Sequence, residues 1–207
     1  MADTATIDSY NKIAEEYHQR NAQTIWTEEY QMFKDFLKDK KDVVEIGCGA
    51  GRDAEELVKL GLTYTGIDAS EGMLKLAEKR VPAGTFQVGD FFKLAFEDES
   101  FDGFWAAASF LHVPKIDIDL VLQEARRILK SNSIGFISVK EKTTMEEGVI
   151  KEAKAEGIQR YFAFYTQDEF ESILKRNNFD IVQKVIVVER DPQAQRWLGF
   201  FVRPAKN

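Results

Sequence analysis

The chain has 207 residues, 44% of them hydrophobic and 12% aromatic, which is enough for one domain with a sizeable core. Its formal net charge of −7 disfavours non-specific binding to polyanions such as nucleic acids. A single cysteine, Cys48, excludes an intrachain disulfide, and two histidines without a metal-binding motif argue against a structural zinc site.

The N-terminal residues, MADTATIDSYNK, lack the apolar core of a signal peptide. No stretch approaches the roughly 20 apolar residues of a membrane span. We therefore expect a cytoplasmic protein without membrane association, either a monomer or a homodimer. No linker or repeat interrupts the sequence, so residues 1–207 are expected to form one domain, with N-terminal helices in residues 1–40 and the main body in residues 41–207.

Two amphipathic helices are predicted first. Apolar residues recur at helical spacing in residues 7–20 and again in residues 24–38. The charged segment KDKKD at residues 38–42 then separates these helices from the rest of the chain.

From residue 42 onward, predicted strands and helices alternate. The strands are expected at residues 42–48, 63–69, 84–90, 101–110, 134–141, 179–189 and 196–204. The helices are expected at residues 52–61, 70–81, 118–130 and 166–177, with Ser70 as an N-cap and Thr166 with Glu169 as a capping box. The last two strands can pair as an antiparallel hairpin. This order predicts an α/β fold with a doubly wound, seven-stranded, mostly parallel sheet.

Three alternate glycines follow the first strand in the segment VVEIGCGAGR, residues 43–52. Glycine permits a positive φ and removes the Cβ atom, so a ligand can approach the backbone closely. The dinucleotide fingerprint GxGxxG would need a third glycine where Arg52 stands, although a nicotinamide oxidoreductase stays an alternative. The pattern EIGCGAG instead resembles motif I of the class I S-adenosylmethionine (SAM)-dependent methyltransferases, in which an acid precedes GxGxG by one apolar residue.

Further segments resemble this family in the same order, over about residues 40–142. They are GIDAS after the second strand, VGDFFKLAFEDESFDGFW around the third and fourth, and EARRILKSNSIGFISV before and in the fifth. The usual Pro-Gly-Gly turn is replaced by Ser-Asn-Ser at residues 131–133. The resemblance implies that Asp68 binds the ribose of the cofactor. It also implies that Asp90 meets the adenine amino group, with Phe91 beside it.

The implied cofactor is SAM, with S-adenosylhomocysteine as the product. Glu45 is expected to order the glycine loop and to face the cofactor's ammonium group. Arg52 either meets the cofactor's carboxylate or is a solvated residue of the first helical turn, and Met73 packs under the adenosine or belongs to the core. The full set of candidate cofactor-binding residues is Glu45, Gly47, Cys48, Gly49, Gly51, Arg52, Asp68, Ala69, Met73, Asp90, Phe91 and Ala107.

The sequence constrains the identity of the methyl acceptor less than that of the cofactor. The segment AAASFLHVP, residues 106–114, lacks the Asn/Asp-Pro-Pro-aromatic motif of family members that methylate nucleobase or amide nitrogens. No aspartate lies between Asp102 and Asp117, so no metal site of the catechol-methylating kind is expected. His112, just past the fourth strand, is a candidate general base because its ordinary pKa is about 6.5, or else it hydrogen-bonds within its loop.

In this family an insertion after the fifth strand, here about residues 143–165, forms a lid with the N-terminal helices. The candidate acceptor-binding residues are Tyr10, Tyr17, His112, Arg160, Tyr161, Phe162 and Tyr165, each of which could instead serve the core. The expected function is transfer of a methyl group from SAM to an O, N or S atom of a small molecule. The C-terminal part also loosely resembles wobble-uridine tRNA methyltransferases, against which the acidic charge argues. A non-catalytic SAM-binding protein is the other alternative.

Overall fold

A computed structural model describes residues 3–21, 26–151, 157–188 and 196–206. The helices are α1 (Thr4–Arg20), α2 (Glu29–Leu37), α3 (Arg52–Lys59), α4 (Glu71–Arg80), α5 (Ile118–Arg127) and α6 (Gln167–Arg176), with a short 3-10 helix at Phe110–His112. The strands of the main sheet are β1 (Asp42–Ile46), β2 (Thr63–Asp68), β3 (Thr85–Val88), β4 (Phe101–Ala107), β5 (Leu129–Glu141), β8 (Phe164–Tyr165), β9 (Phe179–Val188) and β10 (Arg196–Pro204). A separate hairpin consists of β6 (Gly148–Lys151) and β7 (Gln159–Phe162).

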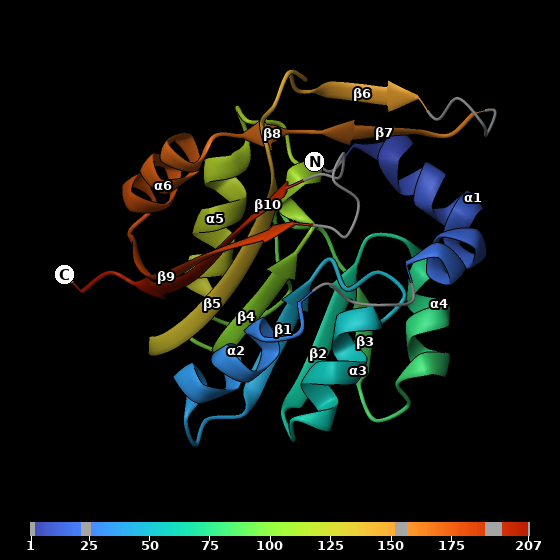
Figure 1. Ribbon diagram of the computed structural model, residues 1–207. Coiled ribbons are helices and arrows are strands. Elements are labelled where there is room, and N and C mark those ends of the chain that lie inside the picture. The colour runs from blue at the N-terminus through green and yellow to red at the C-terminus, as the bar shows by residue number, and fades with distance from the viewer. Residues whose placement is uncertain (1–2, 22–25, 152–156, 189–195, 207) are drawn as a thin grey trace.

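The main sheet runs in the order β3-β2-β1-β4-β5-β10-β9, and the short β8 pairs with β5. All pairs from β3 to β5 are parallel, whereas β10 is antiparallel to both of its neighbours. The predicted doubly wound sheet, its seven main strands and its C-terminal hairpin are therefore confirmed (Figure 1).

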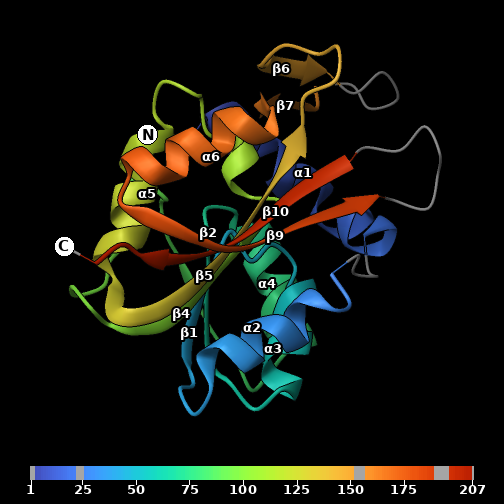
Figure 2. The same ribbon diagram turned by 60° about the vertical axis from the view of Figure 1, so that its left-hand side comes forward.

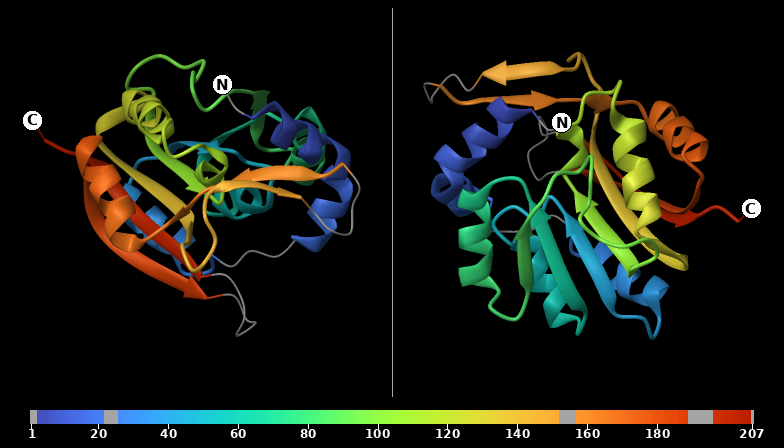
Figure 3. Two further views of the ribbon diagram at one scale, coloured as in Figure 1. Left: turned by 90° about the horizontal axis from the view of Figure 1, so that it is seen from above. Right: turned by 180° about the vertical axis from the view of Figure 1, so that it is seen from behind.

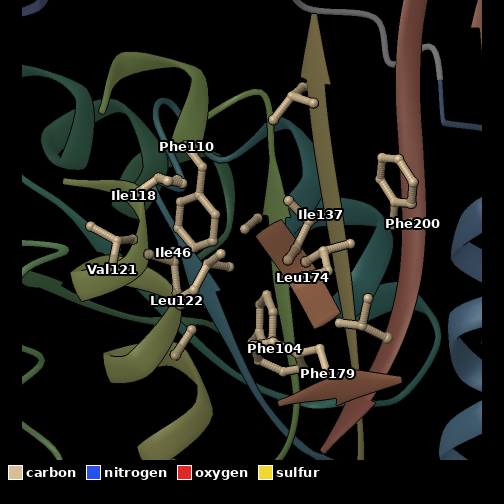
Figure 4. Packing of buried hydrophobic residues seen from close by; sticks show 14 of the residues in the cluster. Ile46, Phe104, Phe110, Ile118, Val121, Leu122, Ile137, Leu174, Phe179 and Phe200 are labelled. Atoms are coloured by element: carbon tan, nitrogen blue, oxygen red, sulfur yellow. The ribbon is translucent and has the colours of Figure 1, made fainter. Parts of the chain in front are cut away.

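Helices cover both faces of the sheet, and each face has its own apolar cluster. On one face, α5 and α6 pack on a cluster that includes Phe104, Phe110 and Phe179 (Figure 4). On the other face, α2 and α3 pack on a cluster around Trp105 and Phe136, whose rings are stacked 4.1 Å apart. Figure 2 shows α2 and α3 on the same side of the sheet. Every residue of β4 is buried, as expected for a central strand covered on both sides.

The caps of the predicted helices are also confirmed. The Ser70 side chain accepts a hydrogen bond from the Met73 amide at the start of α4. At the start of α6, Thr166 and Glu169 form the reciprocal capping box. These polar residues satisfy N–H groups that have no partner inside the helix, which fixes where each helix begins.

Helix α1 and the β6–β7 hairpin lie together at the end of the sheet toward which β1, β2 and β4 point (Figures 1 and 3). Ser9 bonds both the N–H and the C=O of Gln159, and Thr6 Oγ1 accepts from the Tyr161 amide at 2.9 Å. The expectation that both N-terminal helices form a lid is wrong for the second helix, α2. It packs on the sheet face instead, with Tyr30 stacked on Trp105. Residues 24 and 25, predicted to begin this helix, lie outside the described residues.

Candidate functional site

A pocket opens at the carboxyl ends of β1, β2 and β4, with α1 as its outer wall. The chain leaves β1 toward β2 on one side, whereas β4 lies on the other, so this is the point where the strand order reverses. Ligands of open α/β sheets bind at such a position. We call this space the switch-point pocket; it encloses about 1050 Å³, part of it open to solvent. The predicted residues that line it are Glu45, Gly47, Cys48, Gly49, Arg52, Asp68, Ala69, Met73, Phe91, Ala107, His112, Tyr10 and Tyr17.

The three loop glycines all have a positive φ, but for different structural reasons. A Cβ on Gly47 would lie 2.4 Å from the Ser109 Cβ, and a Cβ on Gly51 would lie 3.0 Å from the Ala77 Cα. These two glycines therefore allow close packing. A Cβ on Gly49 would meet nothing within 4 Å. Among the three, Gly49 is the one whose missing side chain leaves open space over the backbone.

Asp68 ties the glycine loop to the end of β2. One carboxylate oxygen accepts from the Gly49 amide and the other from the Ser70 amide, each at 2.8 Å. Burial raises the pKa of Asp68, and the backbone hydrogen bonds partly offset this rise. Two hydrogen bonds leave lone pairs on the carboxylate for a further donor.

Glu45 is only 2% exposed, and its carboxylate accepts a hydrogen bond from the Tyr64 hydroxyl. Burial raises the pKa of Glu45 well above its usual value, and the charge on Asp53 adds to this rise. A buried carboxylate that lines a pocket in this way would be stabilised by a cationic ligand.

Arg52 is not a solvated surface residue. The second of the two possibilities left by the sequence, a solvated residue of the first helical turn, is therefore excluded. Its guanidinium pairs with the carboxylate of Asp53, which also accepts from the Trp105 indole N–H at 3.0 Å. Asp53 is 2% exposed and lines the pocket, yet our sequence reading missed it. Asp53 lies in the first helical turn after the glycine loop, and this position could have identified it as a candidate residue of the pocket.

Met73 is 1% exposed and packs with Ala14 and Ala50, so it joins α1 and α4 beneath the pocket. Phe91 and Phe92 also line the pocket. Asp90 does not line the pocket, and its carboxylate accepts from the Phe92 amide at 3.1 Å. Its local role is therefore to shape the turn that presents the two phenylalanines.

Asn11 is a further residue that our reading missed. Its side-chain oxygen accepts from the Ser70 hydroxyl at 2.7 Å and from the Gly72 amide at 2.9 Å. This residue ties α1 to the start of α4, next to the switch-point pocket. An exposed asparagine on a helix gave no signal from sequence alone.

A second space, which we call the side hollow, adjoins the switch-point pocket. The two share Tyr10, Tyr17, Asn21, Ala108 and His112. The rest of the side hollow is lined by Ile13, Glu16, Arg20, Leu111, Lys140, Arg160, Phe162 and Trp197. Arg160 and Phe162, two of the predicted acceptor residues, thus line the side hollow.

His112 stands between the two spaces in a chain of hydrogen bonds. Its Nδ1 lies 2.6 Å from the carbonyl of Tyr161, which can only accept, so Nδ1 carries the proton. Its Nε2 then accepts from the Tyr10 hydroxyl at 2.8 Å, and that hydroxyl accepts from Arg160 at 3.3 Å. Burial is the main cause that lowers the pKa of His112 to about 3, and the charges of Arg160 and Lys140 lower it further.

The expectation of an ordinary histidine pKa near 6.5 is therefore wrong. His112 is neutral at physiological pH, and it is a weak proton acceptor. Burial also raises the pKa of Tyr10 well above its usual value, so Tyr10 is a neutral phenol. His112 and Tyr10 can therefore form hydrogen bonds with a ligand, but they carry no net charge.

Two predicted acceptor residues line neither space. Tyr165 is fully buried, with its ring packed 4.9 Å from that of Phe170 in the core. Tyr161 contributes its backbone carbonyl to His112, while its hydroxyl turns away and bonds Glu147. Alternation along a strand sends neighbouring side chains to opposite faces, which separates Tyr161 from Arg160 and Phe162.

The turn after β4 holds an unusual backbone conformation beside both spaces. Ala108 has φ 58°, in the left-handed region that costs a non-glycine residue about 1 kcal/mol or more. Its amide donates to the Ser138 hydroxyl at 3.0 Å, which helps to hold this turn. The next residue, Ser109, is 4% exposed and lines the switch-point pocket.

Within the described ranges, no three His, Cys, Asp or Glu side chains are grouped as a metal site would require. None of the helices described is both long and apolar enough to cross a bilayer.

Comparison with known proteins agrees with this geometry. Residues 44–137, which contain the glycine loop, Asp68 and β4, match the family model described as methyltransferase domain. This matched segment makes up somewhat less than half of the chain. The family resemblance of the sequence is thereby confirmed, and SAM is the cofactor of this family.

Two curated relatives of this methyltransferase domain illustrate the range of similarity. Methyltransferase GfsG of Streptomyces halstedii is 36% identical over 95 residues, which cover 42% of this chain and 34% of that protein. Ubiquinone biosynthesis O-methyltransferase of Pelagibacter ubique is 28% identical over 206 residues, with 84% of this chain and 83% of that protein covered. The chain spans about a third of the length of the first curated relatives that it matches.

A solved structure shows the same fold over nearly the whole chain. It is 1,6-didemethyltoxoflavin-N1-methyltransferase of Burkholderia thailandensis, with bound 1,6-didemethyltoxoflavin and S-adenosylhomocysteine. The TM-score is 0.73 at 18% identity, with 98% of this chain and 89% of that one covered. At this identity the similarity establishes the fold of the methyltransferase domain and nothing finer.

Gly49 and Gly51 provide a matched pair of variants. Alanine at either position pays about 1 kcal/mol for the left-handed conformation. Gly49→Ala also places a methyl group in the pocket, so we expect at least about tenfold weaker binding of S-adenosylhomocysteine. Gly51→Ala meets Ala77 instead, so we expect a larger loss of unfolding free energy and unchanged affinity of the folded protein. Calorimetry and urea denaturation measure the two effects, and equal losses of affinity would contradict this division.

His112 makes stability depend on pH. Its folded pKa is about 3, whereas an unfolded histidine titrates near 6.5, so only the unfolded chain binds a proton between these values. The free energy of unfolding then falls as the pH drops below about 6.5. We measure the free energy of unfolding by urea denaturation at about pH 7 and about pH 5.5. The decrease between these two pH values should be about 1 kcal/mol smaller in His112→Gln than in the wild type. Identical pH dependence in both proteins would show that His112 is not kept neutral by the fold.

Proposed function

We propose that this protein transfers the methyl group of SAM to an O, N or S atom of a small molecule. The observation that carries this proposal is the adjoining pair of spaces at the strand-order reversal. One has a bare backbone and buried carboxylates, and the other opens beside it past His112. The match of residues 44–137 to a methyltransferase domain, and the curated methyltransferase relatives, support the reaction type.

The residues of the switch-point pocket fit SAM. Space over Gly49 leaves the backbone accessible to the methionyl group, since no atom lies within 4 Å of a Cβ built there. Asp68 can accept hydrogen bonds from the ribose hydroxyls, and Glu45 can face the ammonium group. Met73 and Phe91 would contact the adenosine. When bound, SAM supplies an electrophilic methyl group on a sulfonium.

The chain's own part in the reaction is to orient the acceptor and exclude water. Orientation of two reactants can supply roughly 7–11 kcal/mol toward the barrier. Helix α1 walls both spaces through Tyr10 and Tyr17, and its bonds to Gln159 hold it there. We infer that α1 and the β6–β7 hairpin belong to the same domain as the sheet, because α1 lines both spaces and the hairpin lines the side hollow.

His112 would act on an acceptor that carries a proton. Its Nε2 lone pair can accept a hydrogen bond from an acceptor hydroxyl or amine in place of the Tyr10 hydroxyl. Because burial lowers the pKa of His112 to about 3, the acceptor would keep its proton until the new bond to the methyl group has begun to form. His112 would thus orient the acceptor first and receive its proton last.

Two other functions were compatible with the sequence. A tRNA methyltransferase would need a basic surface, against a formal net charge of −7. A protein that binds SAM without catalysis would use the switch-point pocket alone. The side hollow next to it favours an enzyme with an acceptor site.

Calorimetry with SAM, S-adenosylhomocysteine and NAD tests the cofactor. We expect binding of the first two and none of NAD, because Arg52 stands where the dinucleotide fingerprint needs glycine. Incubation of the protein with methyl-labelled SAM and a metabolite extract would then identify the compound that acquires the label. Absence of SAM binding at millimolar concentration would refute the proposal, and binding without any labelled product would favour a non-catalytic role.

His112→Ala tests the polar contact to the acceptor. With the labelled compound as substrate, we expect turnover to fall at least about 10²-fold, the usual effect of losing a positioned proton acceptor. Affinity for S-adenosylhomocysteine should be unchanged. The wild-type rate should show no inflection near pH 6.5, because His112 does not titrate there. Unchanged turnover in the variant would remove His112 from the reaction.

A further inference from the structure

Arg52 keeps most of its hydrogen-bond donors available at the wall of the switch-point pocket. An arginine side chain carries five N–H donors. Arg52 uses two of them, on Nε and Nη2, to bond the two carboxylate oxygens of Asp53. In the part of the chain that the structure describes, no other group accepts from this guanidinium, so Nη1 keeps both of its N–H groups. The side chain is 24% exposed and lines the pocket, where it can donate further bonds to a ligand.

Asp53 holds this guanidinium from the side of the core. Its carboxylate also accepts from the Trp105 indole N–H at 3.0 Å. Trp105 is fully buried in the central strand β4, and its ring stacks on Phe136 at 4.1 Å and on Tyr30 at 5.0 Å between centroids. A side chain in such a close-packed core has little freedom to move. The indole N–H therefore fixes the Asp53 carboxylate, whose two oxygens fix the plane of the Arg52 guanidinium.

Glu45 is a third charged group at this part of the pocket. Burial is the main cause that raises its pKa, the charge on Asp53 raises it further, and the charge on Arg52 lowers it. The three groups are therefore neighbours. Arg52 provides donors and Glu45 provides acceptors along the same wall. An amino-acid zwitterion needs both, because its carboxylate accepts hydrogen bonds and its ammonium donates them.

We propose that Trp105 and Asp53 hold Arg52 as a fixed donor for the α-carboxylate in the methionyl part of the cofactor. This inference rests on the proposed function, since it names the residues that bind the amino-acid end of SAM. Arg52 is the binding residue, whereas Asp53 and Trp105 are positioning residues that act through it. Because the guanidinium is oriented beforehand, little side-chain entropy is lost when the carboxylate binds. The Arg52–Asp53 pair is neutral as a whole, so recognition depends on directed hydrogen bonds more than on net charge.

Three ligands separate the carboxylate from the rest of the cofactor. S-adenosylhomocysteine carries the complete amino acid, its decarboxylated derivative keeps only the ammonium, and 5′-methylthioadenosine lacks both groups. Calorimetry on the wild type should give S-adenosylhomocysteine at least about tenfold tighter binding than the decarboxylated derivative, which cannot accept the charged N–H bonds of Arg52. Equal affinity for these two ligands would overturn the proposal.

Variants of Arg52 separate position from charge. Arg52→Gln should weaken binding of S-adenosylhomocysteine at least about tenfold, and it should not weaken binding of the decarboxylated derivative. Arg52→Lys keeps the charge but cannot bond both oxygens of Asp53 in one plane, so it should restore only part of the affinity. Full affinity in Arg52→Lys would show that charge suffices, which would overturn the positioning role of Asp53.

A control variant removes a positive charge elsewhere. Lys175 is exposed on α6 and lines neither space, so Lys175→Gln should leave the affinity for both ligands unchanged. Weakening of S-adenosylhomocysteine binding in Lys175→Gln as large as in Arg52→Gln would mean that the ligand responds to net charge alone. That result would overturn the assigned role of Arg52.

The indole N–H resonance of Trp105 tests the positioning in the wild type, so this measurement does not depend on the folding of a variant. A carboxylate that binds Arg52 shares the guanidinium with Asp53, and Asp53 then bonds the indole N–H more strongly. The Trp105 resonance should therefore move further downfield with S-adenosylhomocysteine than with the decarboxylated derivative. The Trp26 resonance, from outside both spaces, should respond equally to the two ligands. Equal shifts at Trp105 would overturn its role.

Failure of this inference is distinguishable from failure of the proposed function. If the wild type binds neither S-adenosylhomocysteine nor 5′-methylthioadenosine, the cofactor assignment is refuted, and the inference with it. If S-adenosylhomocysteine binds, but no more tightly than its decarboxylated derivative, only the roles of Arg52, Asp53 and Trp105 are refuted. The cofactor assignment would then stand.

Discussion

The parallel pairing of β1 with both β2 and β4 is the constraint on which the site depends. It brings three strand ends to one edge of the sheet, where the chain departs in opposite directions and leaves backbone uncovered. That backbone is held by bonds to its neighbour strand, since the Gly47 and Cys48 amides both donate to the Ile67 carbonyl. The loop is therefore rigid before any ligand arrives, and little ordering entropy opposes binding.

Buried carboxylates gather on one side of His112. Glu45, Asp53 and Asp68 lie toward the ends of β1 and β2, whereas Lys140 and Arg160 lie on the other side of His112. A sulfonium cofactor in the switch-point pocket would lie near these carboxylates. The buried carboxylates are stabilised by specific donors, the Tyr64 hydroxyl for Glu45 and the Trp105 indole for Asp53. Without such partners, burial of these charges would cost several kcal/mol.

Local patterns predicted the fold well, and they predicted many of the residues that line the switch-point pocket. The alternating strands, the Ser70 and Thr166 caps and the glycine loop are each specified within a few consecutive residues. The parallel pairing of β1 with β2 brings the glycine loop after β1 next to Asp68 at the end of β2. These predictions needed only the direction of the strands and the order of the chain.

The acceptor side was predicted less well because it is assembled from distant segments. Tyr10, His112 and Arg160 meet from three elements, and no spacing in the sequence encodes their contact. Burial by those same elements determines the pKa of His112, which a reference value could not anticipate. Tyr165 was placed wrongly because an aromatic residue near a lid can equally fill the core. Nothing in the sequence indicated that Lys140 and Trp197 lie near this site, because their proximity results from the pairing of β5 with β10.

Helix α1 closes the site but contributes little to the core. Its buried residues are Thr6, Ser9 and Ala14, and polar contacts through Asn11, Ser9 and Thr6 fasten it to both rims. A cover fastened in this way can be lifted at small cost, because water replaces the hydrogen bonds that are broken. A ligand enclosed by the switch-point pocket would then enter and leave most easily by displacement of this one helix.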